Sequence, residues 1–285
     1  MKILDGKKLN KEILEDLKSE ILGIKEASQE DVSLVILQTG NDPASNIYIK
    51  NKIIFAEKIG AKCEVVKFDS GAEQLEIIKK IEELNNDQNV NGMILQLPIS
   101  EHLDKQKIIN VIKPEKDVDG LGVINLGKLV NNDSTGIIPA TARGIVTLLK
   151  ENNIEILGKE ITILGRSVLV GKSVALNLIN NDATVSIYHS KSKNLDDAIK
   201  NSDIIISATG QNGIINCNNL RENQVFVDVG ISIVDGRIKG DIDIDTNSVG
   251  YEKIQALSPV PGGVGPMTVA SLFQNLLQAY KMQNK

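Results

Sequence analysis

Short apolar runs that have the length of buried strands alternate with helix-like stretches along most of this 285-residue chain. An amphipathic helix is predicted at residues 7–25, because its apolar residues recur at helical spacing. The order that follows is strand, helix, strand, helix, strand, at residues 33–38, 44–59, 63–68, 73–84 and 92–97. Such an alternation predicts a parallel sheet with helices on its faces.

The same alternation returns in the second half, after an irregular section rich in Asn, Asp and Gly. We predict strands at 160–164, 184–188, 203–207 and 224–229, and helices at 141–151, 172–180, 195–200 and from 267 onward. The fold class that this order predicts is α/β with two domains, the second a Rossmann-like parallel sheet. We place the domains at residues 1–120 and 141–266, with residues 121–140 as their connection.

Composition excludes several classes of protein. The formal net charge is −5, whereas a protein that binds nucleic acid through its phosphates needs a basic face. No apolar run approaches the ~20 residues that span a bilayer, and residues 1–8 lack the apolar core of a signal peptide. Cys63 and Cys217 have no His nearby, so we interpret them as reduced structural thiols and expect no metal site. We therefore expect a cytoplasmic protein without a nucleic-acid or membrane partner.

A turn with the sequence G-R-S-V-L-V-G (residues 165–171) follows the predicted strand 160–164 and opens a helix. A turn in that position presents backbone N–H groups and a helix N-terminus to a phosphate. The two glycines do not have the usual G-x-G-x-x-G spacing, but Arg166 adds a planar fork of donors and Ser167 adds a hydroxyl. These features predict a dinucleotide site at this turn.

The end of the next predicted strand bears on which dinucleotide binds. An NAD site usually has Asp or Glu there, and its carboxylate bonds the ribose 2′-hydroxyl. This chain has Tyr188, His189, Ser190 and Lys191 instead. A carboxylate would repel a 2′-phosphate, so its absence favours NADP over NAD. The alternative is a polar loop beyond a strand with no role in binding.

A lysine and a tyrosine share one face of the helix predicted at 44–59. Asp42 has the position of an N-cap, and Pro43 that of the first helical residue. Tyr48 and Lys52 are then four residues apart and lie one above the other. Taken alone, this pair is a solvated lysine beside a half-buried tyrosine.

Two further residues change that interpretation. Gln96 lies near the end of the strand predicted at 92–97, and Asp119 lies in the segment K-D-V-D-G. Ligands of open parallel sheets bind at the carboxyl ends of strands. Tyr48 and Lys52 belong to a helix that begins after one such end, and Gln96 lies at another. These side chains can therefore converge on one ligand.

The segment S-P-V-P-G-G-V-G-P-M-T (residues 258–268) holds three prolines and three glycines within eight positions. Proline restricts φ, and glycine reaches conformations that other residues avoid. A short apolar run precedes this segment, and a helix-like pattern leaves it. It predicts a rigid strand-to-helix turn whose bare backbone approaches a flat ligand; a tight connection between domains is the alternative.

Five motifs in this order resemble the methylenetetrahydrofolate dehydrogenase/cyclohydrolase family: Y-x-x-x-K, Q-L-P, K-D-V-D-G, G-R-S-x-x-V-G and the 258–268 loop. The resemblance implies that Lys52 is the catalytic lysine, that Gln96 positions it, and that Asp119 and Tyr48 hold the pterin ring. It also implies substrate contacts from Pro261, Gly262 and Gly263. The cofactor contacts that it implies are Gly165, Arg166, Ser167, Ser190 and Ile231.

The resemblance further implies a homodimer whose C-terminal helix, residues 267–285, packs back on the first domain. The implied activity is the NADP-dependent oxidation of 5,10-methylenetetrahydrofolate, followed by hydrolysis of the methenyl product to 10-formyltetrahydrofolate. A monofunctional dehydrogenase and a non-catalytic dinucleotide-binding module are the alternatives. The chain departs from the family pattern at several positions: Leu121, Ala140, Ala142, Lys172 and Ser232.

Overall fold

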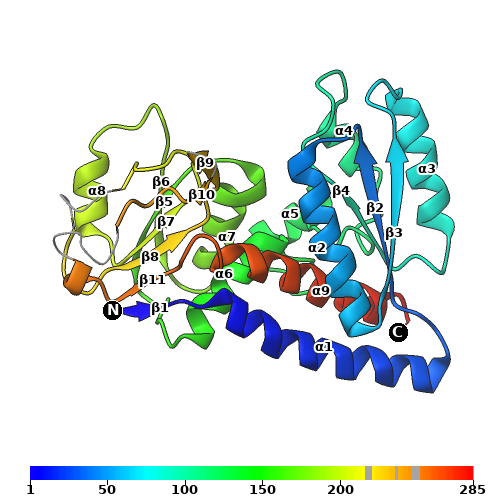
Figure 1. Ribbon diagram of the computed structural model, residues 1–285, viewed down its shortest axis with the longest axis horizontal. Coiled ribbons are helices and arrows are strands. Elements are labelled where there is room, and N and C mark those ends of the chain that lie inside the picture. Colours follow the sequence, from blue (N-terminus) through cyan, green and yellow to red (C-terminus); the bar gives the residue numbers. More distant parts are fainter. Residues whose placement is uncertain (216–219, 235–236, 245–250, 285) are drawn as a thin grey trace. The chain divides into compact units, whose positions relative to one another are not determined.

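The computed structural model describes residues 1–215, 220–234, 237–244 and 251–284. The chain divides into two compact units, each built around its own parallel sheet (Figure 1). The small-sheet unit comprises Lys11–Ala140 and Val269–Lys285, and the large-sheet unit comprises Met1–Asn10 and Thr141–Thr268.

The small-sheet unit is organised by three parallel strands in the order β3-β2-β4. Their bounds are Ser33–Thr39 for β2, Lys62–Phe68 for β3 and Gly92–Leu95 for β4. The helices of this unit are most of α1 (Gly6–Ser28), α2 (Pro43–Ile59), α3 (Gln74–Asn86), α4 (Lys105–Ile109), α5 (Val123–Val130) and the later part of α9 (Val264–Gln283). The predicted order of strand, helix, strand, helix, strand is confirmed.

Local sequence explains where α2 begins and ends. The Asp42 carboxylate accepts a hydrogen bond of 2.7 Å from the backbone N–H of Ser45, and Pro43 is the first helical residue. Gly60 closes the helix in the left-handed conformation, with φ of 77°, which a glycine adopts without strain. The predicted N-cap is confirmed, and Lys52 lies within the helix that it opens.

The C-terminal helix α9 packs within the small-sheet unit, as predicted. The rings of Phe273 and Phe55 stack with their centroids 4.9 Å apart. The Asn275 amide donates to the carbonyl oxygens of Val118 (2.9 Å) and Ile138 (2.8 Å). These contacts fix the backbone within the K-D-V-D-G segment, at Val118, and the backbone that later passes beside it, at Ile138.

The large-sheet unit contains six parallel strands in the order β1-β11-β8-β7-β5-β6. The strands are β1 (Lys2–Ile3), β5 (Glu160–Leu164), β6 (Thr184–Tyr188), β7 (Ile204–Ser207), β8 (Val225–Asp228) and β11 (Ala256–Leu257). Helical segments between them are α6 (Ala140–Glu151), the turn η1 (Val168–Lys172), α7 (Ser173–Ile179), α8 (Leu195–Asn201) and η3 (Tyr251–Lys253). A separate antiparallel hairpin joins β9 (Ser232–Val234) to β10 (Arg237–Lys239). The parallel Rossmann-like sheet is confirmed.

The two units differ from the expected domains at two stretches of the chain. Residues 1–10 lie with the large-sheet unit, because β1 pairs with β11 through Lys2 and Ala256. The expected connection, residues 121–140, lies within the small-sheet unit and contains α5. Its polar composition misled the prediction: the Asn125 amide is buried and bonds the backbone, donating to Pro114 and accepting from Ile137.

Among the described residues, no helix is long and apolar enough to cross a membrane. Cys63 is a free thiol on β3, and burial raises its pKa to about 11. At neutral pH it therefore stays protonated and unreactive. Cys217 lies outside the described residues.

Candidate functional site

Lys52 and Gln96 meet at the carboxyl end of the small sheet. The Lys52 ammonium or amine Nζ donates to Gln96 Oε1 over 2.8 Å. The Gln96 side chain is 8% exposed, and its own amide nitrogen donates to the Leu97 carbonyl over 2.8 Å. Both ends of the Gln96 amide are therefore engaged, and its oxygen is fixed as the acceptor for Lys52.

The strands explain why Gln96 faces α2. Its backbone N–H donates to the Leu37 carbonyl over 2.9 Å, which continues the pairing of β4 with β2 by one residue. Side chains alternate across a strand, so Gln96 projects to the face opposite Leu95. Lys52 and Tyr48 come from α2, one helical turn apart, and Tyr48 is exposed.

Burial disfavours the charged ammonium form of Lys52. Burial lowers the pKa of Lys52, while the negative charge of Asp119 opposes that change. Burial raises the pKa of Asp119, and Lys52 opposes that change in turn. The two groups thus feel each other's charge, and Asp119 belongs to the same electrostatic environment as Lys52 and Gln96.

This arrangement can perform general acid–base chemistry. A neutral lysine amine that donates one N–H to Gln96 keeps its lone pair free to take a proton. A depressed pKa makes that neutral form accessible nearer to neutral pH. The carboxylate of Asp119 supplies acceptors for N–H groups of a bound ring.

One buried residue of the K-D-V-D-G segment was not predicted as functional. Asp117 lies two positions before Asp119 and is buried. Its carboxylate accepts hydrogen bonds from the backbone that follows Asp119. The sequence does carry a signal that could have identified Asp117: it is a second acid in a short segment that also contains two glycines, Gly120 and Gly122.

In the large-sheet unit, the predicted phosphate turn follows β5 and requires both of its glycines. Gly165 has φ of +115°, and a Cβ there would lie 2.6 Å from the Ala208 carbonyl oxygen. A Cβ on Gly171 would lie 2.1 Å from the Gly165 carbonyl oxygen. Ser167 caps η1 by accepting from the Val170 N–H over 3.2 Å, and Arg166 is exposed. The turn is a tightly folded backbone that carries an exposed cation, Arg166, which fits a dinucleotide phosphate.

Ser190 lies at the neighbouring strand end. Leu164 of β5 pairs in register with Tyr188 of β6, so the segments that follow these two residues lie at the same sheet edge. The 188–191 segment folds on itself, since the His189 N–H donates to Ser192 Oγ over 3.0 Å. Ser190 is exposed, and no carboxylate occurs from 188 to 191. These residues fit a phosphorylated ribose.

The loop that carries Ile231 is held by a buried carboxylate that the sequence analysis missed. Asp241 Oδ2 accepts from Ser207 Oγ (2.7 Å), Thr209 N (2.7 Å) and Thr209 Oγ1 (2.9 Å). Gly230 packs directly on it, because a Cβ there would lie 1.8 Å from Asp241 Oδ1. Asp241 therefore joins the loops that follow β7 and β8. Asp241 is the first of three alternating aspartates in the sequence D-I-D-I-D (residues 241–245), and that pattern does not single it out for this role.

Pro261, Gly262 and Gly263 lie in the predicted strand-to-helix turn between β11 and α9. Gly262 has φ of +122°, and its carbonyl accepts from the Lys7 N–H over 3.0 Å. The Gly263 N–H donates to the Pro259 carbonyl over 2.7 Å. Within the large-sheet unit, these bonds hold the turn against the start of α1.

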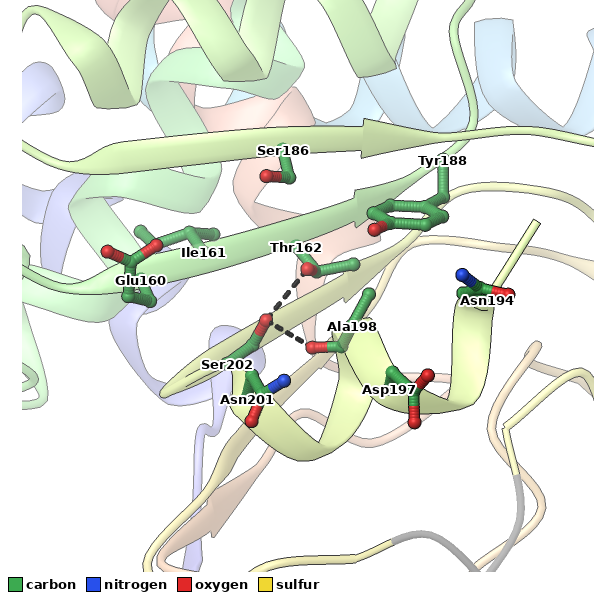
Figure 2. Close-up of a pocket in the computed structure, with 10 residues that line it drawn as sticks. All are labelled: Glu160, Ile161, Thr162, Ser186, Tyr188, Asn194, Asp197, Ala198, Asn201 and Ser202. Carbon is green, nitrogen blue, oxygen red and sulfur yellow. Dashed lines mark hydrogen bonds between the residues drawn. The ribbon is translucent and has the colours of Figure 1, made fainter. Parts of the chain in front are cut away.

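A cavity of about 330 Å³ also lies in the large-sheet unit, between α8 and the strands β5 and β6 (Figure 2). Its lining contains none of the predicted site residues and consists of Glu160, Ile161, Thr162, Ser186, Tyr188, Asn194, Asp197, Ala198, Asn201 and Ser202. Ser202 Oγ bonds Thr162 Oγ1 (2.7 Å) and the Ala198 carbonyl (2.8 Å), so these groups are already satisfied. Tyr188, the last residue of β6, lines this cavity and also begins the 188–191 segment, so the cavity adjoins the sheet edge of the predicted cofactor site.

Two family models match nearly the whole chain. The catalytic domain of tetrahydrofolate dehydrogenase/cyclohydrolase matches residues 4–119, and the NAD(P)-binding domain of the same enzymes matches residues 139–284. The bifunctional protein FolD of Lactobacillus gasseri is 42% identical over 283 residues, which cover 99% of each chain.

Solved structures of similar proteins cover the same length. The bifunctional FolD dehydrogenase/cyclohydrolase of Campylobacter jejuni has a TM-score of 0.95, with 37% identity and 99% of each chain covered. The Trypanosoma brucei methylenetetrahydrofolate dehydrogenase-cyclohydrolase was solved with NADP and an inhibitor. It has a TM-score of 0.93 and 31% identity, and the match covers 99% of this chain and 98% of that one.

Proposed function

This chain belongs to the tetrahydrofolate dehydrogenase/cyclohydrolase family, and from that premise we propose that it carries out both reactions of the family. It oxidises 5,10-methylenetetrahydrofolate to the methenyl form with NADP, and it hydrolyses the methenyl form to 10-formyltetrahydrofolate. The observation that carries the second activity is the 2.8 Å contact between Lys52 and Gln96, in a setting that lowers the pKa of the lysine.

The oxidation needs positioning rather than a base. In the substrate a CH₂ group bridges two nitrogens, and a nitrogen lone pair can expel hydride directly, leaving a delocalised cation. NADP, when bound, accepts that hydride. Asp119 accepts hydrogen bonds from the pterin ring and Tyr48 stacks on it, so the donor carbon is held in one orientation.

The hydrolysis needs a proton acceptor and later a proton donor. Water adds its oxygen to the cationic carbon and gives one proton to the neutral Lys52 amine. As the bond from that carbon to N5 breaks, the Lys52 ammonium returns the proton to N5, and the remaining hydroxyl proton leaves to solvent. Gln96 keeps Nζ in place throughout by accepting one of its N–H groups. Positioned acid–base groups of this kind contribute about 10²–10⁴-fold.

A monofunctional dehydrogenase would need no lysine base, so the Lys52–Gln96 pair favours the bifunctional enzyme. The test follows two products from methylenetetrahydrofolate and NADP: reduced cofactor, and methenyltetrahydrofolate by its absorbance. We expect reduced cofactor to form and the methenyl intermediate to be cleared faster than it hydrolyses spontaneously. Accumulation of the intermediate would indicate a monofunctional enzyme, and failure to form reduced cofactor would exclude both enzymes.

NADP lies at the carboxyl edge of the large sheet in this proposal, with Gly165, Arg166, Ser167, Ser190 and Ile231 as its contacts. Arg166→Ala should weaken NADP binding about tenfold or more and NAD binding much less. The reason is that a charge-assisted bond to the 2′-phosphate is lost. Titration calorimetry with NADP and with NAD measures the difference.

The control for this experiment is Lys200→Ala. Lys200 is an exposed cation near the end of α8, which leads into β7 and so lies away from the carboxyl ends of the strands. This variant should bind NADP as the parent does. An equal loss of NADP and NAD on Arg166→Ala would place Arg166 at the pyrophosphate rather than at the 2′-phosphate.

A homodimer is the assembly that we propose, on the family resemblance and on one exposed apolar pair. Ile233 of β9 and Ile238 of β10 are paired in register, and they are 76% and 51% exposed. An isolated hairpin is marginally stable in water, so a second copy that covers these side chains would stabilise it. We also propose a cytoplasmic location, with no nucleic-acid partner, consistent with the net charge of −5.

Ile233→Glu should convert the dimer to monomer at micromolar concentration, since it places a charge in an apolar contact. Sedimentation velocity measures the change. Ile179→Glu is the matched control, because Ile179 is an exposed apolar residue of the same unit at the end of α7. A parent chain that sediments as a monomer would contradict the assembly.

A further inference from the structure

The K-D-V-D-G segment folds around the carboxylate of Asp117, which is 1% exposed. Asp117 Oδ1 accepts from the backbone N–H of Gly120 (3.1 Å) and of Leu121 (3.4 Å). Asp117 Oδ2 accepts from the Gly122 N–H (2.8 Å) and from the Asn125 side-chain amide (3.1 Å). One carboxylate therefore receives four hydrogen bonds, three of them from consecutive backbone groups.

Asp119 lies inside the loop that these bonds close. The loop leaves the Asp117 backbone, passes through Asp119, and returns to the Asp117 side chain at Gly120. Gly120 has φ of +69°, and a Cβ there would lie 2.7 Å from the Ile137 carbonyl oxygen, so the return path is narrow. The backbone that carries Asp119 is thus tied on both sides to the same carboxylate.

The loop is also tied to the strand that leads to Gln96. The Met93 N–H of β4 donates to the Lys116 carbonyl over 2.7 Å, and Met93 and Asp117 form a parallel bridge. The Asn275 amide holds the Val118 carbonyl over 2.9 Å. These contacts place Asp117 between the β4 strand and Asp119, so the position of Asp119 relative to Gln96 is set through it.

An uncharged side chain could not make the same set of contacts. An amide has one acceptor oxygen, whereas the Asp117 carboxylate uses both of its oxygens. Burying a carboxylate next to the Asp119 carboxylate is costly unless it is fully hydrogen-bonded. The hydrogen bonds that Asp117 accepts from the loop backbone therefore explain a buried acid at this place better than packing does.

We propose that Asp117 is a positioning residue that sets the place of the Asp119 carboxylate for both the oxidation and the hydrolysis. This inference rests on the proposed function, in which Asp119 binds the pterin ring. Asp117 itself touches neither substrate nor cofactor; it acts through the loop.

The first test is Asp117→Asn, which keeps the volume and removes one acceptor. We expect kcat/KM to fall on the order of tenfold for both reactions, mostly through a higher KM for the folate, because a hydrogen bond to a charged group is lost. Binding of NADP should stay at the parent value, since that unit is untouched. Asp104→Asn is the matched control, because the exposed Asp104 carboxylate also bonds a backbone N–H, that of Lys107 over 3.1 Å.

The second test separates positioning from a general structural role. If Asp117 acts through Asp119, then Asp117→Asn should have little further effect in an Asp119→Ala background, so the two losses are not additive. Full additivity, or unchanged folate kinetics in the single variant, would overturn the inference. If Asp117→Asn does not fold, Asn125→Ala removes one donor to the same carboxylate and should show a smaller loss of the same kind; unchanged folate kinetics in that variant would also overturn the inference. A parent chain without either activity would instead refute the proposed function.

Discussion

Lys52→Met should abolish the hydrolysis and leave a measurable dehydrogenase. Methionine keeps much of the apolar stem and removes the amine that takes the proton from water. The expected fall in hydrolysis is on the order of 10²-fold or more, the usual contribution of a positioned acid–base group. Oxidation needs positioning but no proton acceptor, so methenyltetrahydrofolate should accumulate when the variant is given methylenetetrahydrofolate and NADP. Its absorbance is followed at a pH where spontaneous hydrolysis is slow.

The matched control is Lys50→Met, which removes an exposed lysine from the same helix, α2. That variant should clear the intermediate at the parent rate. If Lys52→Met also clears it at the parent rate, Lys52 is not the base and the hydrolytic mechanism is wrong. The parent's pH profile gives an independent check. Because the free amine is the active form and burial lowers the pKa of Lys52, the hydrolysis rate should rise as pH rises through that lowered pKa.

Asp119→Ala should damage both reactions together, by about tenfold or more in kcat/KM for each. Both steps use the same pterin ring in the same place, and removing a charged hydrogen-bond partner typically costs roughly 1.5–3 kcal/mol. The loss of Asp119 also removes a negative charge that opposes the lowering of the Lys52 pKa. If some hydrolysis remains, the pH at which its rate rises should therefore be lower than in the parent.

Asp69→Ala is the control for this variant, because Asp69 is an exposed carboxylate of the same unit. It should leave both activities at the parent values. Normal dehydrogenation combined with lost hydrolysis in Asp119→Ala would refute its role in holding the ring. Such a result would assign Asp119 to the proton transfer alone.

Much of the fold could be predicted because local patterns carry it. Alternating apolar strands and helices predicted both parallel sheets, and the Asp42 cap and the four-residue spacing placed Tyr48 and Lys52 on one helix face. The glycines at 165 and 171 were predicted to form a phosphate turn, and both positions leave no room for a side chain. The helix cap, the residue spacing and the turn each depend on residues close together in the sequence, and each strand and helix is predicted from its own local pattern.

The sequence by itself thus determined the order of the elements, the fold class and, through five ordered motifs, the family. Only the tertiary structure decided which side chains meet: Lys52 and Gln96, 44 residues apart, come within 2.8 Å. It also decided that β1 joins the large sheet, that Asp117 anchors the loop of Asp119, and that burial lowers the pKa of Lys52. The physical reason is the separation along the sequence of the residues that determine each feature. Helix and strand patterns arise from periodic burial of nearby residues, whereas contacts and pKa shifts depend on what chain closure brings together from distant segments.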